Sequence, residues 1–229
     1  MSFLERAITD GHAKLTGEGK QEKILYVAVN HTERYADPEE QVRAEFWAEL
    51  IYRYGYEPAR IGVEITVPDR TPSDRADLVV FRDDERKKPY AVIECKQDGV
   101  TDAEFNQAVE QACGNGTWAK FRANYVGVVA GMTRRFFDFS EKYGVLEREA
   151  NIIADLPRQY GKPEEYRFYK GDPNNDIQPV SKEALIGAIK KCHQTLWGGG
   201  KRNPAAAFGE LCKIIFVKIS DEMKPRRVG

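Results

Sequence analysis

The 229-residue chain is long enough for one large domain, or for one domain with a smaller appendage. Its hydrophobic residues make up 41% of the sequence, a share that supports a folded core and excludes global disorder. The sequence has no apolar run of about 18 residues, and its N-terminus is charged. We therefore expect a cytoplasmic protein without a membrane span or a secretory signal.

The net charge of −1 conceals an uneven distribution along the chain. Residues 181–229 contain ten lysines and arginines against four aspartates and glutamates, which leaves the rest of the chain acidic. A sequence-independent DNA-binding protein that acts alone usually has a basic surface. If this chain binds DNA, its contacts with phosphates must be local or must come from another domain or subunit.

The cysteines and histidines do not form a metal-binding pattern. The four cysteines lie far apart without a C-x-x-C spacing, and the three histidines form no i,i+4 pair. This argues against a zinc site and against a disulfide framework, and it fits a reducing cytoplasm.

The expected elements follow the hydrophobic pattern in chain order. A short N-terminal helix precedes a Gly-rich linker up to residue 19, and residues 23–29 are predicted to form a short strand. Asp37, as an N-cap before a proline, is typical of a helix start, and this helix is expected to run to about Tyr54. Alternation then predicts a strand over residues 60–67.

The remaining elements complete an α/β pattern. Two apolar strands fall within residues 73–97, and a helix is predicted from Thr101 to about Phe121, with the G-N-G at residues 114–116 expected to weaken or split it. The other predicted elements are strands over 125–130 and 134–139, a loop-rich segment over 151–178, and helices over about 181–196 and 204–218. Strand pairs flanked by helices predict an α/β sandwich with a central mixed sheet and a C-terminal helical segment.

Three ionisable residues interrupt the two apolar strands of residues 73–97. They are Asp77 on the first strand and Glu94 and Lys96 on the second. Strands this apolar are normally buried on both faces, and a buried charge is costly unless it is paired or coordinates a metal. The three residues are therefore candidates for a functional site.

The predicted register brings the two carboxylates together. If Arg82 pairs with Pro89 across the turn, Asp77 lies directly opposite Glu94. Opposed residues on antiparallel strands have Cβ atoms about 4.5–5.5 Å apart, where like charges repel. A divalent cation between the carboxylates removes that repulsion. Lys96 is expected on the same face as Glu94, because side chains alternate along a strand.

These side chains suit a hard divalent cation such as Mg²⁺, with Mn²⁺ as a substitute. Mg²⁺ takes oxygen ligands, often one or two carboxylates together with waters and substrate phosphates. Asp77 and Glu94 supply the carboxylates, and the backbone carbonyl of Cys95 is a further candidate ligand. The ion would lower the pKa of a bound water and stabilise charge on a phosphodiester, and Lys96 would orient that water. The predicted reaction is phosphodiester hydrolysis.

Each of these residues also has a structural interpretation. Asp77 would be a strand-start residue paired with Arg75, and Glu94 with Lys96 would form a surface ion pair of little energetic value. The D…E-x-K pattern alone is weak in a chain of which 31% is charged. The matching register of three charges on apolar strands favours the functional interpretation.

Four motifs carry a resemblance to a known family. They are P-E-E-Q-V-R at 38–43, Y-G-Y-E-P at 54–58, R-A-D-L-V-V at 75–80 and V-I-E-C-K at 92–96. They resemble the N-terminal nuclease domain of type I restriction enzyme R subunits, which belongs to the PD-(D/E)xK superfamily. The resemblance covers roughly residues 33–130. It implies a restriction-endonuclease-like core and Mg²⁺-dependent cleavage of double-stranded DNA, with Asp77, Glu94 and Lys96 as the catalytic set.

The resemblance implies two further site residues. The family's metal-binding glutamate of the first helix corresponds best to Glu40, with Glu39 and Glu45 as rivals. A glutamine that is common in the helix after the E-x-K strand corresponds to Gln111, and less closely to Gln107. Such domains often carry a tyrosine four residues after that glutamine, where this chain has an asparagine.

The last segment resembles a different family. L-W-G-G-G at 196–200 and A-F-G-E-L-C-K-I-I-F-V-K-I-S-D-E at 207–222 look like the helical start of the N6-adenine DNA methyltransferase region of restriction–modification proteins. We expect a nuclease domain over residues 1–180 and this helical segment over 181–229, within a longer nuclease–methyltransferase fusion. The alternative is a basic amphipathic helix that completes the domain's own core.

Two functional hypotheses follow. In the first, the chain is a metal-dependent DNA endonuclease domain of a restriction–modification protein, whose DNA methyltransferase and specificity components lie in the same chain or in trans. In the second, the nuclease fold is catalytically inactive and is a scaffold that assembles with a methyltransferase. A third alternative is a nuclease of the same fold that cleaves RNA or acts in DNA repair. The sequence has no Walker A motif, so any ATP-driven translocation would reside elsewhere.

Overall fold

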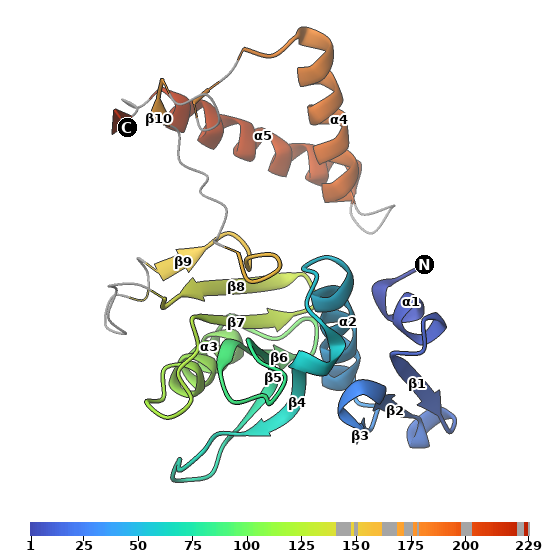
Figure 1. The fold of residues 1–229 in the computed structure, drawn as a ribbon. Coiled ribbons are helices and arrows are strands. Elements are labelled where there is room, and N and C mark those ends of the chain that lie inside the picture. The colour runs from blue at the N-terminus through green and yellow to red at the C-terminus, as the bar shows by residue number, and fades with distance from the viewer. Residues whose placement is uncertain are drawn as a thin grey trace. The chain divides into compact units, whose positions relative to one another are not determined.

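A computed structural model describes residues 1–140, 148, 151–161, 169–171, 176–177, 179–197, 203–223 and 227–228 (Figure 1). The chain forms two compact units, Met1–Glu164 and Glu165–Gly229. This division falls among residues outside the described ranges, and the domain boundary expected after residue 180 stays a prediction.

The first unit is built around a six-stranded mixed sheet. Its strands, in spatial order, are β4 (Ile61–Thr66), β5 (Arg75–Phe81), β6 (Pro89–Lys96), β7 (Tyr125–Ala130), β8 (Thr133–Asp138) and β9 (Ile152–Ile153). Strands β6 and β7 run parallel, and the other neighbours are antiparallel. The parallel pair needs a crossover, and the helix α3 (Asp102–Gly116) lies between the two strands in the chain. The predicted α/β sandwich with a mixed sheet is confirmed.

Two helices cover the sheet through separate apolar clusters. Phe46 and Leu50 of α2 (Pro38–Tyr52) belong to the same buried cluster as Ile93 of β6. Phe105 of α3 belongs to another cluster, together with Val128 of β7. Because the central strands are buried on both faces, they read as continuous apolar runs in the sequence.

The N-terminal residues form a small sheet of their own, with the strands β1 (Ala13–Thr16), β2 (Lys23–Tyr26) and β3 (His31–Glu33) after the helix α1 (Phe3–Thr9). The prediction of a linker up to residue 19 is wrong over Ala13–Thr16. These residues form β1, in which Ala13 is fully buried and pairs with Tyr26. The strand expected over residues 23–29 ends at Tyr26, because Val27–Val29 form a 3-10 turn.

The hairpin of β5 and β6 has the predicted register beside the charged residues but not at the turn. Leu78 pairs with Ile93, which puts Asp77 level with Glu94. Farther along, Phe81 pairs with Pro89, so the expected partnership of residues 82 and 89 is wrong by one position. A bulge between the two regions absorbs the difference.

The helix α3 differs from its prediction in how it ends. It is continuous through residues 114–116 and stops at Gly116, so it is neither split nor extended to Phe121. Gly116 lies against β7, where an added Cβ would come 2.4 Å from Cγ2 of Val126. Beside it, Asn115 is fully buried and its amide donates to the backbone oxygen of Arg75 at 3.1 Å. The glycine is therefore a close-packing residue rather than a helix breaker.

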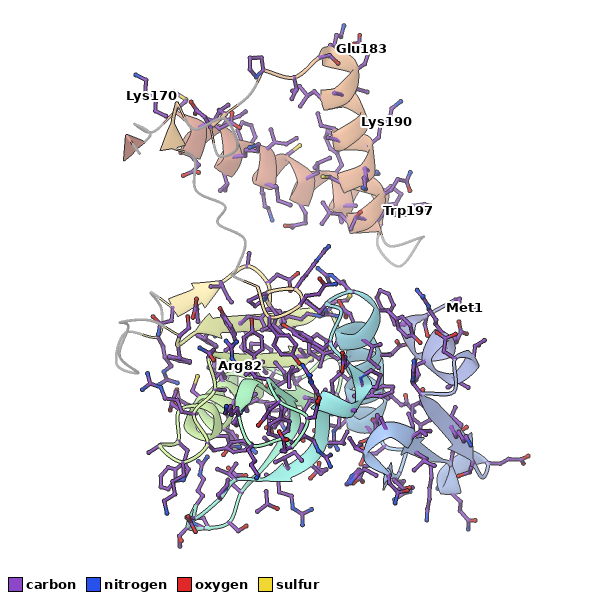
Figure 2. All side chains as sticks on the ribbon, in the orientation of Figure 1. Met1, Arg82, Lys170, Glu183, Lys190 and Trp197 are labelled. Atoms are coloured by element: carbon purple, nitrogen blue, oxygen red, sulfur yellow. The ribbon has the colours of Figure 1, made fainter. Side chains whose placement is uncertain are left out.

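The second unit contains the two predicted C-terminal helices, α4 (Lys182–Trp197) and α5 (Pro204–Glu222), and a short parallel pair of β10 (Tyr169–Lys170) and β11 (Arg227–Val228). Glu183, Lys190 and Trp197 mark the course of α4 (Figure 2). Large apolar side chains of α5 remain exposed, among them Phe208 and Phe216. The Gly-rich break at residues 198–202 and much of the loop-rich segment expected over 151–178 lie outside the described residues.

No helix in the described part of the chain is long and apolar enough to cross a membrane.

Candidate active site

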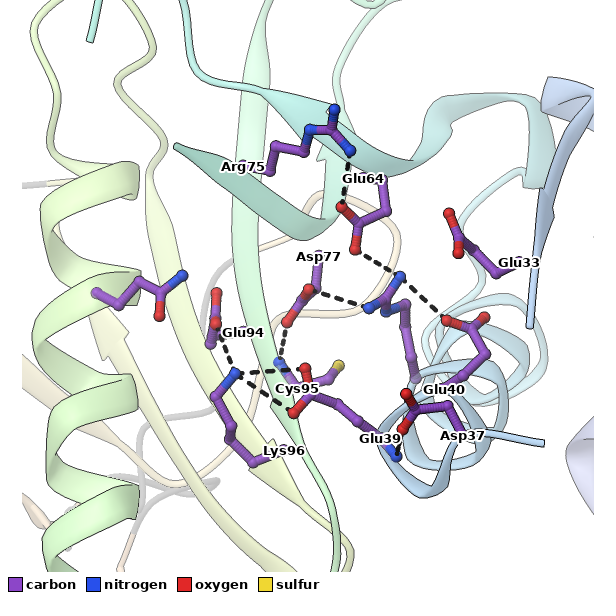
Figure 3. Close-up of polar contacts among 12 residues, drawn as sticks. Glu33, Asp37, Glu39, Glu40, Glu64, Arg75, Asp77, Glu94, Cys95 and Lys96 are labelled. Carbon is purple, nitrogen blue, oxygen red and sulfur yellow. Dashed lines mark hydrogen bonds and ion pairs between the residues drawn. The ribbon is translucent and has the colours of Figure 1, made fainter. Parts of the chain in front are cut away.

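The three charges that interrupt the apolar strands lie together at one end of β5 and β6. Asp77 and Glu94 are 8% and 2% exposed, respectively, and Lys96 is half-buried at the end of β6. Figure 3 shows their polar groups pointing toward a common region beside the N-terminal end of α2. The structure therefore brings the predicted catalytic set together.

Lys96 connects the strand to the helix α2. Its Nζ lies 3.0 Å from Oε1 of Glu94 and 3.4 Å from Oε1 of Glu39. Glu39 reaches this position because the α2 N-cap Asp37 starts the helix two residues earlier, accepting from the Glu39 backbone N–H at 3.1 Å. The helix start that the sequence predicts thus places a third carboxylate at the site.

Asp77 is held by two donors. Its Oδ2 accepts a hydrogen bond of 2.6 Å from the backbone N–H of Cys95, and its Oδ1 lies 3.3 Å from Nη2 of Arg43. The first contact fixes the carboxylate against the edge of β6, where the side chain of Cys95 itself is fully buried. A role for the Cys95 carbonyl as a metal ligand stays a prediction.

Arg43 is a site residue that the sequence reasoning did not single out. Its buried guanidinium contacts Glu40 at 3.0 Å and Glu64 at 2.7 Å, in addition to Asp77 (Figure 3). The i,i+3 spacing from Glu40 on a predicted helix is the signal that would have indicated the first of these pairs. Glu64 lies on β4, and no sequence pattern marks it.

The helix glutamates are not equivalent. Glu40 is buried, accepts a hydrogen bond from the hydroxyl of Tyr26, and makes its ion pair with Arg43. Burial raises the pKa of Glu40 to about 7, although Arg43 opposes the shift. Glu45 accepts from the backbone N–H of Leu4 at 3.2 Å. Of the three candidates, Glu39 is the one that contacts Lys96.

Gln111 lies on α3 with its amide nitrogen 3.5 Å from Oδ1 of Asp74, one residue before β5. Gln107 is exposed. Asn115 occupies the position where related domains often have a tyrosine, and it is buried. Its side-chain amide accepts a hydrogen bond from the Arg70 guanidinium and donates one to the backbone oxygen of Arg75, the first residue of β5. The structure thus directs Gln111 toward the strand that carries Asp77, but not into contact with Asp77 itself.

The electrostatics of the pair follow from burial. Loss of hydration raises the pKa of Glu94, and the nearby Asp77 raises it further. Burial likewise raises the pKa of Asp77, against the opposing effect of Arg43. For Lys96 burial favours the neutral form, but the neighbouring Glu94 outweighs it and raises the pKa. Lys96 is therefore an ammonium group, and the two carboxylates are costly to keep ionised together.

The donor set fits a hard divalent cation by its chemistry. The carboxylates of Glu39, Asp77 and Glu94 offer the oxygen ligands that Mg²⁺ prefers, and the repulsion between Asp77 and Glu94 is of the kind that a cation relieves. Within the described ranges, no three His, Cys, Asp or Glu side chains converge as a preformed metal site.

Comparison with known families places the chain in a family. Residues 38–157, just over half of the chain, match the family described as the type I restriction enzyme R protein N terminus (HSDR_N). The chain belongs to this family. No curated protein matches it.

The family assignment covers the site but not the whole chain. The matched residues include α2, β5, β6 and α3 of this type I restriction enzyme R protein N terminus, and they support a restriction–modification nuclease-like domain. The N-terminal sheet of residues 13–33 and the helices α4 and α5 lie outside the match. The methyltransferase resemblance of residues 181–229 accordingly stays a prediction.

Proposed function

We propose that this chain is a metal-dependent DNA endonuclease domain of a restriction–modification protein, which hydrolyses phosphodiester bonds in double-stranded DNA. The observation that carries the proposal is the gathering of Asp77, Glu94 and Lys96 at the ends of two adjacent strands. In a member of the R protein family, this arrangement favours catalysis over a purely structural network.

Asp77 and Glu94 would hold Mg²⁺ or Mn²⁺, with Glu39 as a further carboxylate at the edge of the site and the Cys95 carbonyl as a candidate. When bound, such an ion lowers the pKa of a water ligand and stabilises negative charge on a phosphodiester. Glu40 is tied to Tyr26 and Arg43, so its contribution would be to position that arginine.

The protein groups have separate roles in this proposal. The backbone N–H of Cys95 and the guanidinium of Arg43 orient the Asp77 carboxylate. Lys96, whose pKa Glu94 raises against the opposing effect of burial, would donate hydrogen bonds to an attacking water or to a phosphate oxygen. Gln111 would either contact the DNA or hold the segment before β5 in place, because its amide nitrogen lies next to the Asp74 carboxylate.

The test is nicking of supercoiled plasmid DNA in Mg²⁺ and in Mn²⁺. We expect Asp77→Ala, Glu94→Ala and Lys96→Ala to abolish cleavage, and Lys88→Ala on the exposed hairpin turn to leave it unchanged. Full activity of the Lys96→Ala protein would refute its role. We propose that the chain acts in the cytoplasm with a DNA methyltransferase and a specificity component as partners. Because the first 180 residues are acidic, the assay is also run with these partner components added.

A second candidate function rests on Arg43. Its guanidinium contacts Asp77, Glu40 and Glu64. It therefore neutralises part of the negative charge of these carboxylates without a metal ion. This arrangement favours a catalytically inactive nuclease fold that is a scaffold for a DNA methyltransferase. Titration calorimetry with Mn²⁺ separates the two: binding that is lost in Asp77→Asn supports the nuclease, and absence of binding supports the scaffold.

A further inference from the structure

A basic groove lies apart from the candidate active site, at the turn between β1 and β2. It has a volume of about 520 Å³ and is lined by Thr16, Gly17, Lys20, Gln21, Lys23 and Arg34. Three of these residues are cationic, two carry a hydroxyl or an amide group, and none is a carboxylate. The groove precedes the residues that match the R protein family, so the family assignment does not account for it.

The cations of the groove have no acidic partner. Lys20, Lys23 and Arg34 are exposed and form no ion pair among the described residues. Arg34 donates from Nε to the backbone oxygen of Lys20 at 3.2 Å, which leaves its terminal nitrogens available. In contrast, Arg43 and Arg53 of the same unit are engaged by carboxylates. The groove thus presents three cations that form no ion pair within the described part of the chain, although Glu18, Glu22 and Glu33 stand beside them in the sequence.

The backbone holds the groove in shape. Thr16 pairs with Lys23 across the two strands, and the intervening residues form a 3-10 turn. Gly17 has a φ of +78°, and a Cβ at this position would come 2.7 Å from the backbone oxygen of Gln21. Only glycine fits this close approach, and the bond from Arg34 to Lys20 ties the end of β3 to the same turn.

The groove is close to the candidate active site along the chain. Arg34 is followed by a turn in which the Asp37 N–H donates to its backbone oxygen at 3.1 Å, and α2 begins immediately afterwards. Glu39, which contacts Lys96, is five residues from Arg34, so their Cα atoms are at most about 18 Å apart. A DNA duplex spans that distance in about five base pairs.

We propose that this groove binds a phosphate in the backbone of the same DNA duplex that the candidate active site engages. The inference rests on the proposed function for the identity of the nucleic acid. Lysine and arginine side chains, helped by hydroxyl and amide donors, are the groups that contact DNA phosphates without reading sequence. The N-terminal sheet would thus supply one local phosphate contact on a body that is acidic overall.

The test measures binding in EDTA, so that it does not depend on cleavage. Fluorescence anisotropy of a short labelled duplex is followed over about 50–200 mM NaCl with the full chain. The triple variant Lys20→Gln, Lys23→Gln, Arg34→Gln is compared with a matched variant, Arg86→Gln, Lys87→Gln, Lys88→Gln, which removes three exposed cations from the hairpin of β5 and β6.

We expect the groove variant to bind at least about 10-fold more weakly at low salt and to reduce the salt slope by about 1–3, because each released phosphate contact contributes about 0.9. The matched variant should bind like the wild type, and both should keep the wild-type circular dichroism spectrum. Equal affinity of the two variants, or no duplex binding by the wild type, would overturn the proposal. The proposal would also be overturned if the groove bound inorganic phosphate but did not bind duplex DNA.

The failure of this inference is distinguishable from failure of the proposed function. If the groove variant loses binding while the wild type never cuts DNA, the groove assignment stands and the nuclease assignment falls. If Asp77→Ala abolishes cutting while the groove variant binds and cuts DNA like the wild type, the nuclease assignment stands and the groove assignment falls.

Discussion

Nζ of Lys96 lies 3.0 Å from Oε1 of Glu94, two residues earlier on the same strand. The two side chains project from the same side of β6, and Glu94 is the buried partner. The ion pair with Glu94 raises the pKa of Lys96 despite burial, which favours the ammonium form of this lysine. Its proposed work is to orient a water or a phosphate oxygen, and metal affinity should depend on the carboxylates instead.

This division predicts different outcomes for the two residues. Lys96→Met should reduce the cleavage rate by about 100-fold or more, the usual effect of removing a positioned hydrogen-bond donor. It should retain Mn²⁺ affinity, because an ammonium group repels the ion. Glu94→Gln should lose both. Plasmid nicking and Mn²⁺ calorimetry on the same preparations check this, and loss of Mn²⁺ binding in Lys96→Met would show that the lysine only maintains the structure.

Arg43→Ala should lower the free energy of unfolding strongly. It would leave the buried carboxylates of Glu40 and Asp77 without this cation, a change that typically costs about 3–5 kcal/mol. Urea unfolding measures the loss, and added Mn²⁺ should restore part of it by replacing the missing charge. The control is Arg75→Ala: that side chain is exposed and 3.7 Å from Glu64, so a change above about 1 kcal/mol would contradict this view.

Register explains why the strand residues of the site were predictable and the helix residues were not. Asp77 and Glu94 interrupt continuous apolar runs joined by a short charged turn, so their proximity was predicted from that turn, and a bulge absorbs its one-residue error. The choice among Glu39, Glu40 and Glu45 depends on how α2 is rotated against the sheet. That rotation is set by packing of residues distant in sequence, such as Phe46 against the core, and helical periodicity alone does not supply it.

Two misjudged segments have similar causes. The glycines around β1 predict a linker, but the buried residue of this strand, Ala13, pairs with Tyr26. Gly116 predicts a helix break, but its missing Cβ makes room for Val126. In both cases the deciding contact is with a residue that the local sequence does not reveal.

Glu49 of α2 gives a pH-dependent prediction. Burial acts to raise its pKa, but the hydrogen bond from Arg134 and the contact with Arg53 outweigh it and lower the pKa. A lowered folded-state pKa means that the ionised group stabilises the fold above its unfolded pKa of about 4.3, and that this stability is lost as pH falls through the folded pKa. Glu49→Gln should therefore lower the free energy of unfolding by about 1–3 kcal/mol at neutral pH.

The difference between wild type and Glu49→Gln should shrink as pH is lowered below about 4. Urea unfolding of both proteins across this range checks it. A difference that stays constant with pH would mean that the substitution acts through packing and not through the charge.

Gly116 provides a paired test of close packing at the end of α3. Gly116→Ala places a Cβ 2.4 Å from Cγ2 of Val126 on the buried strand β7, which must shift or leave its rotamer, at a cost of about 1–3 kcal/mol. Gly114→Ala, two residues earlier, meets only the far end of the long Arg70 side chain, at 2.9 Å, and alanine favours the helix there. We therefore expect Gly116→Ala to lower the melting temperature and Gly114→Ala to leave it unchanged or raise it. The opposite order would mean that the helix end yields more easily than β7.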